Sequence, residues 1–155
     1  MKYSTLILAL LLTFSCKKEK TKTNYLGVVN ITISGKEKAI PHFEKGLLLL
    51  HSFEYQDARE AFQKAQEEDP LMPMSYWGEA MTYNHSLWGE QDYDNAIAAL
   101  NKIEDINLDK SATDLERDFI KAIQILYQPK IDKNERDVAY ASFMKGLTKK
   151  YPANH

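Results

Sequence analysis

The sequence has a single cysteine among its 155 residues, Cys16, so no disulfide bond can form within the chain. With 6 glycines, 5 prolines and 44% hydrophobic residues, it is neither collagen-like nor disordered in composition. A net positive charge is also missing, because the formal net charge is −2 and no Lys/Arg block has the size found in nucleic-acid binders. We therefore expect one globular domain and no nucleic-acid partner.

Long hydrophobic runs are missing as well. The apolar run at residues 6–12, preceded by the positive start Met1-Lys2, is too short to cross a bilayer. Seven residues at about 1.5 Å each reach roughly 10 Å, a third of the hydrocarbon layer of about 30 Å. A positive start followed by a short apolar core is typical of a secretory signal, which we place at residues 1–15.

The end of this segment resembles a bacterial lipobox, because Ser15 directly precedes Cys16, although Thr13 replaces the usual aliphatic residue. The resemblance implies cleavage before Cys16, a lipid on its thiol, and a membrane-anchored protein of the bacterial cell envelope. A polar tether follows at residues 17–23 and carries no acidic cluster, which by resemblance to exported envelope lipoproteins implies a protein that faces the periplasm. The alternative is an ordinary secreted protein with a free thiol.

The rest of the chain contains three copies of a helical pattern, in which an aromatic residue precedes a small one by three positions and an apolar one by four. The copies are Phe43, Gly46, Leu47, Leu50 and His51; Trp77, Ala80, Met81, Asn84 and His85; and Phe119, Ala122, Ile123, Leu126 and Tyr127. A second helical set follows each one: Tyr55, Ala58, Phe62 and Ala65; Tyr93, Ala96, Leu100 and Ile103; and Arg136, Ala139, Phe143 and Gly146. Each copy predicts a helix hairpin whose small residues let the two helices approach closely.

Local signals predict where helices begin. Pro41 suits the first turn of a helix that starts at about residue 40. The capping-box spacings Thr113-x-x-Glu116 and Asp132-x-x-Glu135 predict further starts near residues 114 and 133. Residues 25–33 are rich in β-branched and apolar side chains without a partner strand, and they predict an extended arm packed on the first hairpin.

Gly46, Ala58, Phe62, Ala65 and the Asp69-Pro70 pair resemble the tetratricopeptide repeat signature in residue type and spacing. The resemblance covers residues 39–152 and implies an all-α, right-handed solenoid of about three hairpins at 39–72, 73–110 and 113–152. Residues 16–38 would then form the lipidated cysteine, the tether and the arm. The second hairpin has a turn four residues longer, and the third departs most, because Gly146 stands where alanine is usual.

No nucleophile elbow, zinc-protease, phosphate-loop or Cys-x-x-Cys motif is present, so we expect no enzyme and no cofactor. His51 and His85 occupy equivalent repeat positions, yet two imidazoles make an incomplete metal site even if Glu54, Glu79 or Glu90 contributes oxygen. We expect no metal. The alternative hypothesis is a small-ligand or metal site formed by the loop at residues 84–91 with both histidines.

In tetratricopeptide arrays, the first helix of each hairpin lines a concave groove that binds a segment of a partner protein. The resemblance therefore implies a protein-binding adaptor or scaffold. Trp88, in the loop, either contacts the ligand or seals the hairpin end. A carboxylate clamp is not expected, because apolar residues occupy two of its positions. The implied groove residues are Phe43, Leu47, Leu50, His51, Trp77, Met81, Asn84, His85, Trp88, Phe119, Ile123 and Tyr127.

The chain stops directly after the third hairpin, without the polar capping helix that usually ends a solenoid. Two readings follow. Either the sequence is the N-terminal part of a larger repeat protein, or the last hairpin self-associates.

Overall fold

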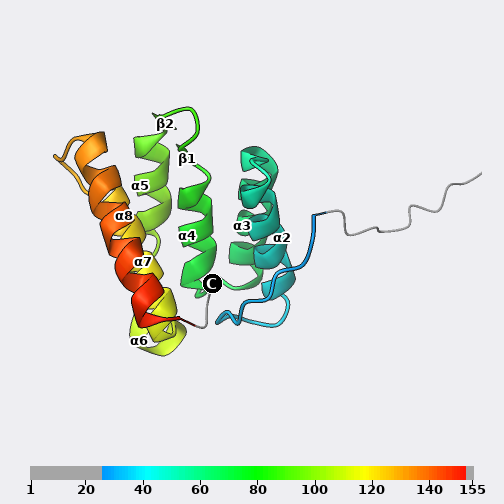
Figure 1. Ribbon diagram of the computed structural model, residues 1–155. Coiled ribbons are helices and arrows are strands. Elements are labelled where there is room, and N and C mark those ends of the chain that lie inside the picture. Colours follow the sequence, from blue (N-terminus) through cyan, green and yellow to red (C-terminus); the bar gives the residue numbers. More distant parts are fainter. Residues whose placement is uncertain (1–25, 153–155) are drawn as a thin grey trace, which may run out of the picture.

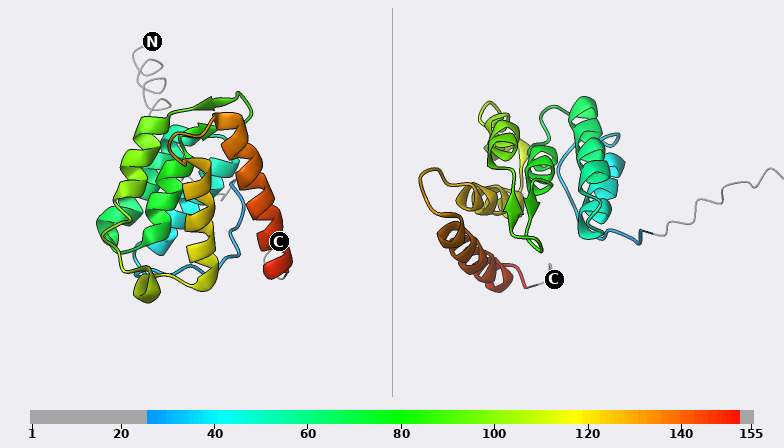
Figure 2. Two further views of the ribbon diagram at one scale, coloured as in Figure 1. Left: turned by 90° about the vertical axis from the view of Figure 1, so that its left-hand side faces the viewer. Right: turned by 90° about the horizontal axis from the view of Figure 1, so that it is seen from above.

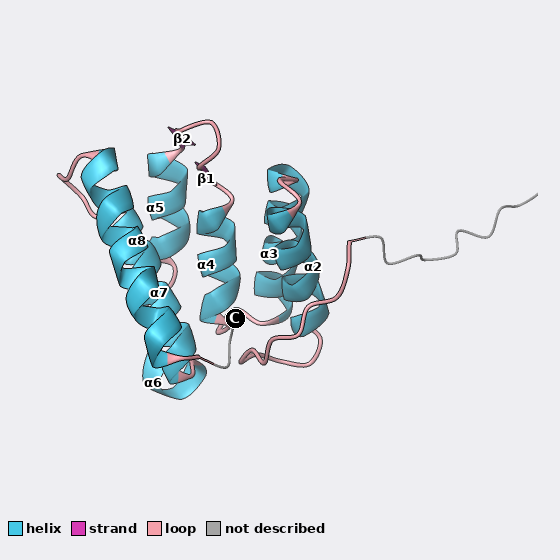
Figure 3. Cartoon of the chain, in the orientation of Figure 1, coloured by secondary structure: helices cyan, strands magenta, loops and turns pink. Residues whose placement is uncertain are grey.

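The computed structural model describes residues 26–152, so the predicted signal segment, Cys16 and the tether lie outside the described residues. Within this part no helix has the length and apolar character needed to cross a membrane. The described part of the chain is mostly helical, as the sequence predicts, and forms seven helices and one small two-stranded hairpin (Figures 1 and 3). The helices are α2 (Ile40–His51), α3 (Tyr55–Glu68), α4 (Pro73–Met81), α5 (Tyr93–Asn101), α6 (Leu108–Ser111), α7 (Asp114–Leu126) and α8 (Lys133–Lys150).

Helices that follow one another in the sequence pack together as α2 with α3, α4 with α5, and α7 with α8. Helix α4 also contacts both α2 and α7, so the first helix of each pair lies beside the next one. The helices form a row that begins with α2 and α3 and ends with α8 (Figures 1 and 2). The predicted loop between α4 and α5 contains a short antiparallel ladder, β1 (Asn84–His85) with β2 (Glu90–Gln91).

The predicted helix starts are confirmed. Pro41 lies in the first turn of α2, where a missing N–H costs nothing. At the start of α7, Thr113 and Glu116 form the full capping box. Helix α8 is capped by Asp132, which accepts a hydrogen bond from the backbone N–H of Asn134 without a reciprocal bond from Glu135.

Phe62 of α3 fills the space between two other helices and is fully buried. Gly46 of α2 and Gly78 of α4 both lie against this ring, and Cδ1 and Cε1 are among its nearest atoms to each. A Cβ atom added at Gly46 would come within 2.8 Å of the Phe62 ring, and one added at Gly78 within 2.3 Å. Phe43 packs on the same ring, with 5.5 Å between centroids. These two glycines therefore allow α2, α3 and α4 to pack around one aromatic side chain.

Helix α8 presents a different face to α7 from the one its repeat alignment predicts. Ala139 and Gly146 were expected between the two helices, but both are exposed. Arg136, which the alignment places on the same face, is buried: one terminal guanidinium nitrogen donates to the carbonyl of Leu126 at 3.1 Å, and the guanidinium lies 5.0 Å from the centre of the Tyr93 ring. Leu147 is the other buried residue of α8, so the helix turns the face of Arg136 and Leu147 inward and the small residues outward.

The described part of the arm, residues 26–33, is extended as predicted, but its attachment goes beyond the first hairpin. Ser34, which follows the arm, donates its backbone N–H and its hydroxyl to the carboxylate of Glu116 in α7, at 2.6 and 2.7 Å. The next anchor is on α3, where the backbone N–H of Lys36 donates to Asp69 at 2.8 Å. The arm therefore links the beginning of the helical row to α7.

Candidate binding groove

An apolar groove of about 470 Å³ runs across the first helices of the three pairs. Residues of α2, α4, α7 and α8 line it, together with the arm and the turns at one end of the helices. Most of these side chains are aliphatic, aromatic or thioether. The lining residues are Ile31, Phe43, Leu47, Leu50, His51, Phe53, Tyr55, Met74, Trp77, Met81, Asn84, Ser86, Phe119, Tyr140 and Met144.

Eight of the residues implied by the repeat resemblance lie together in this groove: Phe43, Leu47, Leu50, His51, Trp77, Met81, Asn84 and Phe119. They come together because residues three, four and seven apart share a face of each first helix, and these helices lie side by side. Trp77 and Phe119 make the contact between α4 and α7, with ring centroids 5.8 Å apart in an edge-on arrangement.

The other four implied residues lie elsewhere. Ile123 and Tyr127 are buried in the core and do not line the groove. The Tyr127 hydroxyl donates to the carbonyl of Ala80 at 3.2 Å, and burial raises the pKa of this hydroxyl well above its usual value. His85 and Trp88 pack in a separate cluster beside the groove.

This aromatic cluster joins the α2–α3 turn to the β1–β2 turn. His85 stacks on Tyr55 with 4.2 Å between ring centroids, and Trp88 lies edge-on to Tyr55 and Phe53 at 6.2 Å from each. Trp88 is nevertheless 60% exposed and Phe53 is 51% exposed. Trp88 thus packs against the neighbouring turn and at the same time presents a large apolar surface to solvent.

The groove carries no formal charge from carboxylate, ammonium or guanidinium groups, since no Asp, Glu, Lys or Arg of the described chain lines it. A carboxylate clamp, which needs cationic side chains, has no counterpart in this lining. Burial raises the pKa of Tyr140, which keeps its hydroxyl neutral. The indole N–H of Trp77 is buried without a hydrogen-bond acceptor among the described residues. An unpaired buried donor of this kind lowers stability.

The repeat pattern did not identify seven of the lining residues. Met74 could have been found, because it lies one helical turn before Trp77 and two turns before Met81 on the same face of α4. Tyr140 and Met144 share a face of α8, but nothing in the sequence indicates that this face closes the groove. Ile31, Phe53 and Ser86 come from the arm and the turns, and Tyr55 is the first residue of α3; their positions depend on the complete fold.

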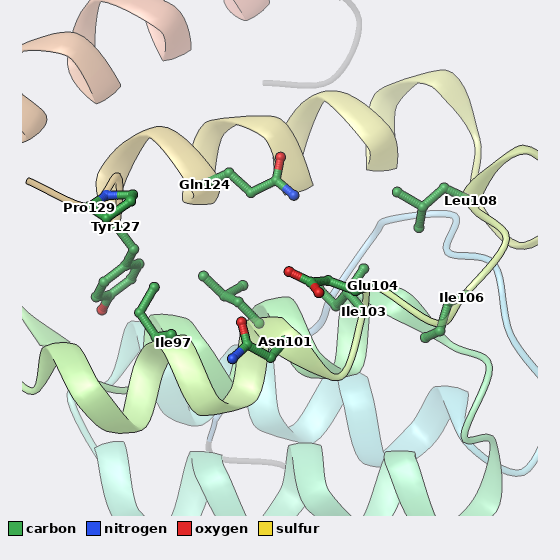
Figure 4. Close-up of a pocket in the computed structure, with 10 residues that line it drawn as sticks. Ile97, Asn101, Ile103, Glu104, Ile106, Leu108, Gln124, Tyr127 and Pro129 are labelled. Atoms are coloured by element: carbon green, nitrogen blue, oxygen red, sulfur yellow. The ribbon is translucent and has the colours of Figure 1, made fainter.

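A second cleft, of about 410 Å³, lies between α5 and α7 (Figure 4). The two helices meet where the Tyr93 hydroxyl donates to the Tyr127 carbonyl at 3.2 Å, and they diverge beyond this contact. Ile97 and Asn101 of α5 lie on one side of the cleft and Gln124 of α7 on the other. The cleft holds one carboxylate, that of Glu104; Tyr127 is its one aromatic lining residue, and no methionine lines it.

Within residues 26–152, no three His, Cys, Asp or Glu side chains are grouped so that they could hold a metal ion. His85 contacts the carbonyl of Thr82 at 3.2 Å and the carboxylate of Glu90 at 3.8 Å, while His51 lines the groove. Of the three glutamates considered as ligands, Glu79 is buried in a network of its own and accepts hydrogen bonds from Gln63, Gln66 and Lys102.

No protein-family model, curated protein or solved structure matches the chain.

Proposed function

We propose that this chain is a non-catalytic adaptor that binds a segment of a partner protein in the groove. The observation that carries the proposal is the lining itself. Trp77 and Phe119 contribute rigid aromatic surface and Met81 and Met144 contribute adaptable surface, while Phe43 and Met74 are almost completely buried and lie beneath them in the same groove. Aromatic side chains are the usual anchors of protein interfaces, and methionine is overused at surfaces that accommodate apolar segments.

The occupant that this lining fits is a protein segment that presents apolar side chains at regular intervals. No charged side chain lines the groove, so a strongly charged ligand would be desolvated without a partner. The polar groups of His51, Asn84 and Ser86 lie toward one end, where they can orient the backbone of a bound segment. Apolar contact then supplies the affinity.

Phe53 gives further support. Its φ angle is 62°, in the left-handed region where a non-glycine side chain is strained. Glycine is the usual residue at this position after a helix, because it adopts the conformation without cost. A binding role explains why an exposed phenylalanine occupies this strained backbone position at the rim of an apolar groove.

The paired helices fit a tetratricopeptide-like array, which is the architecture we propose for residues 39–152. The support is the side-by-side packing of α2, α4 and α7, together with small buried residues at the predicted helix contacts Gly46, Ala58 and Ala96. Such arrays use the surface formed by their first helices for partner binding.

We further propose that lipid on Cys16 anchors the adaptor in the bacterial cell envelope, where it faces the periplasm. The lipobox-like Ser15-Cys16 pair and the polar tether support this proposal. Intact mass measured on protein from a native membrane fraction tests it: a chain that begins at a lipidated Cys16 is expected. A chain that retains residues 1–15, or a free thiol at Cys16, would contradict it.

The binding function can be tested with peptides selected by display on the wild-type protein. Selected peptides are expected to repeat apolar residues, and Met81→Glu in the groove should abolish their binding. Ile97→Glu in the cleft is the matched control, because Met81 and Ile97 are both half-buried helix residues of the second pair. If Ile97→Glu abolishes binding and Met81→Glu does not, the groove is not the site.

A further inference from the structure

The outward face of α8 carries an exposed valine and several small residues between charged ends. No described element covers it, as the views along and across the row show (Figures 1 and 2). Val138 is 71% exposed, and Ala139, Ser142 and Gly146 are exposed on the same face. A Cβ atom added at Gly146 would meet nothing within 4 Å. At the centre of a solvent-exposed helix face, polar and charged side chains are usual, rather than valine, alanine and glycine.

The two ends of this face carry opposite charges. Glu135 lies near the start of α8 and Lys149 near its end, separated by 14 residues or about 21 Å along the axis. At 100° per residue, both lie within about 20° of Ser142 around the helix. Both are exposed, and neither forms an ion pair with another described residue. Lys145, three residues after Ser142, is also exposed on this face. The face therefore has a negative end, a centre of Val138 and small residues, and a positive half with two lysines.

We propose that this face binds a second copy of the same chain, with the two α8 helices antiparallel and a two-fold axis at Ser142. In this register Glu135 of each copy lies opposite Lys149 of the other, so the charge pairs form twice. Val138 lies opposite Gly146, where the missing side chain leaves room for its methyl groups. Such a self-complementary patch is what a two-fold interface requires.

The dimer goes beyond the proposed peptide binding and leaves it intact. Tyr140 and Met144, which line the groove, lie about 160° around α8 from Ser142, on the opposite side of the helix. Both grooves of the dimer therefore remain open. Two anchored copies would also present two grooves to one partner, which raises the effective affinity for a repeated ligand.

Disulfide cross-linking of the full chain in its native membrane tests the register. The two-fold axis places residue 142 against its own copy, so Ser142→Cys should give cross-linked dimers under mild oxidation. Lys64→Cys, on an exposed part of α3, is the matched control and also accounts for any cross-linking through Cys16. A yield for Ser142→Cys no higher than the control, or cross-links to a different protein, would overturn the proposal.

Charge exchange tests the pairing in the Ser142→Cys background. Glu135→Lys places like charges at both symmetry-related contacts and should weaken self-association about tenfold. Lys149→Glu should do the same. The two changes in one chain, or a mixture of the two singly changed chains, should restore cross-linking to within about twofold, because opposite charges again meet.

Glu60→Lys and Lys64→Glu on α3 carry the same changes in net charge away from this face and should leave the yield unchanged. If the doubly changed chain cross-links as poorly as Glu135→Lys alone, the antiparallel pairing is wrong. All of these positions are exposed, so melting temperatures are expected to agree closely with that of the parent and report that each variant is folded.

Discussion

Replacing Gly78 with alanine tests the packing that sets the spacing of α2, α3 and α4. The new Cβ would lie 2.3, 2.5 and 2.6 Å from three ring atoms of Phe62. These distances are far inside van der Waals contact, and the fully buried ring cannot move into solvent. Overpacking of this kind costs about 1–3 kcal/mol, whereas alanine gains about 1 kcal/mol over glycine in helix propensity. We expect a net loss of up to about 2 kcal/mol in the free energy of unfolding.

The sign should reverse when the ring is absent. Phe62→Ala alone should cost about 3–5 kcal/mol, because it leaves a cavity between three helices. In that background Gly78→Ala meets empty space and should stabilise the protein by about 1 kcal/mol through helix propensity. Urea unfolding of the four proteins, in the same concentration of a stabilising osmolyte, measures this double-mutant cycle.

Gly146→Ala is the matched control, because it adds the same methyl group to a helical glycine with open space around it. We expect it to stabilise the protein by about 1 kcal/mol, in contrast to Gly78→Ala. The reasoning is refuted if Gly78→Ala changes stability equally with and without Phe62, since the two sites would then be uncoupled.

Three further predictions concern the groove rim, the buried Glu79 network and the attachment of the arm to α7. Phe53→Gly should keep or raise stability, because it relieves a positive φ angle, yet weaken binding of selected peptides severalfold; unchanged binding, measured by fluorescence anisotropy, would remove Phe53 from the rim. Burial raises the pKa of Glu79, but its hydrogen bonds and Lys102 outweigh burial and lower it. Its stabilisation is therefore present above the normal glutamate pKa and lost as the pH falls through the folded value. Glu79→Gln should cost about 1–3 kcal/mol in urea unfolding at neutral pH and progressively less in acid; a constant difference across this range would contradict the assignment. Ser34→Ala and Glu116→Gln should each destabilise the protein and should cost together about 1 kcal/mol less than their sum, since they share a hydrogen bond; strict additivity in the same assay would show that the bond contributes nothing.

Features set by neighbouring residues could be predicted from the sequence. The capping box of Thr113 and Glu116 depends on four consecutive residues, and the structure forms it as expected. The same signal could not show that the Glu116 carboxylate also accepts two hydrogen bonds from Ser34, 82 residues earlier. That contact depends on how the arm crosses the folded helices.

Helix faces were harder to assign than helix positions. Ile123 and Tyr127 occupy the same repeat positions as groove residues of the other copies, but they lie in the core. One turn of such a helix contains both residues that face the groove and residues that face the core. On α8, the repeat alignment placed Arg136, Ala139 and Gly146 on one inward face, but of these three only Arg136 is buried. A periodic pattern predicts that a helix has an apolar face, but the partner of that face is decided by packing.

The measurement that tests the central claim most directly is a methyl NMR titration of protein labelled at its methionine methyl groups, with a peptide selected on the wild-type chain. Met74, Met81 and Met144 line the groove, whereas Met72 is 1% exposed in the core and serves as an internal control. The account predicts that the three groove methyl signals shift on binding and that the Met72 signal stays in place. A bound peptide that leaves all three groove signals unchanged would contradict the assignment of this groove as the binding site.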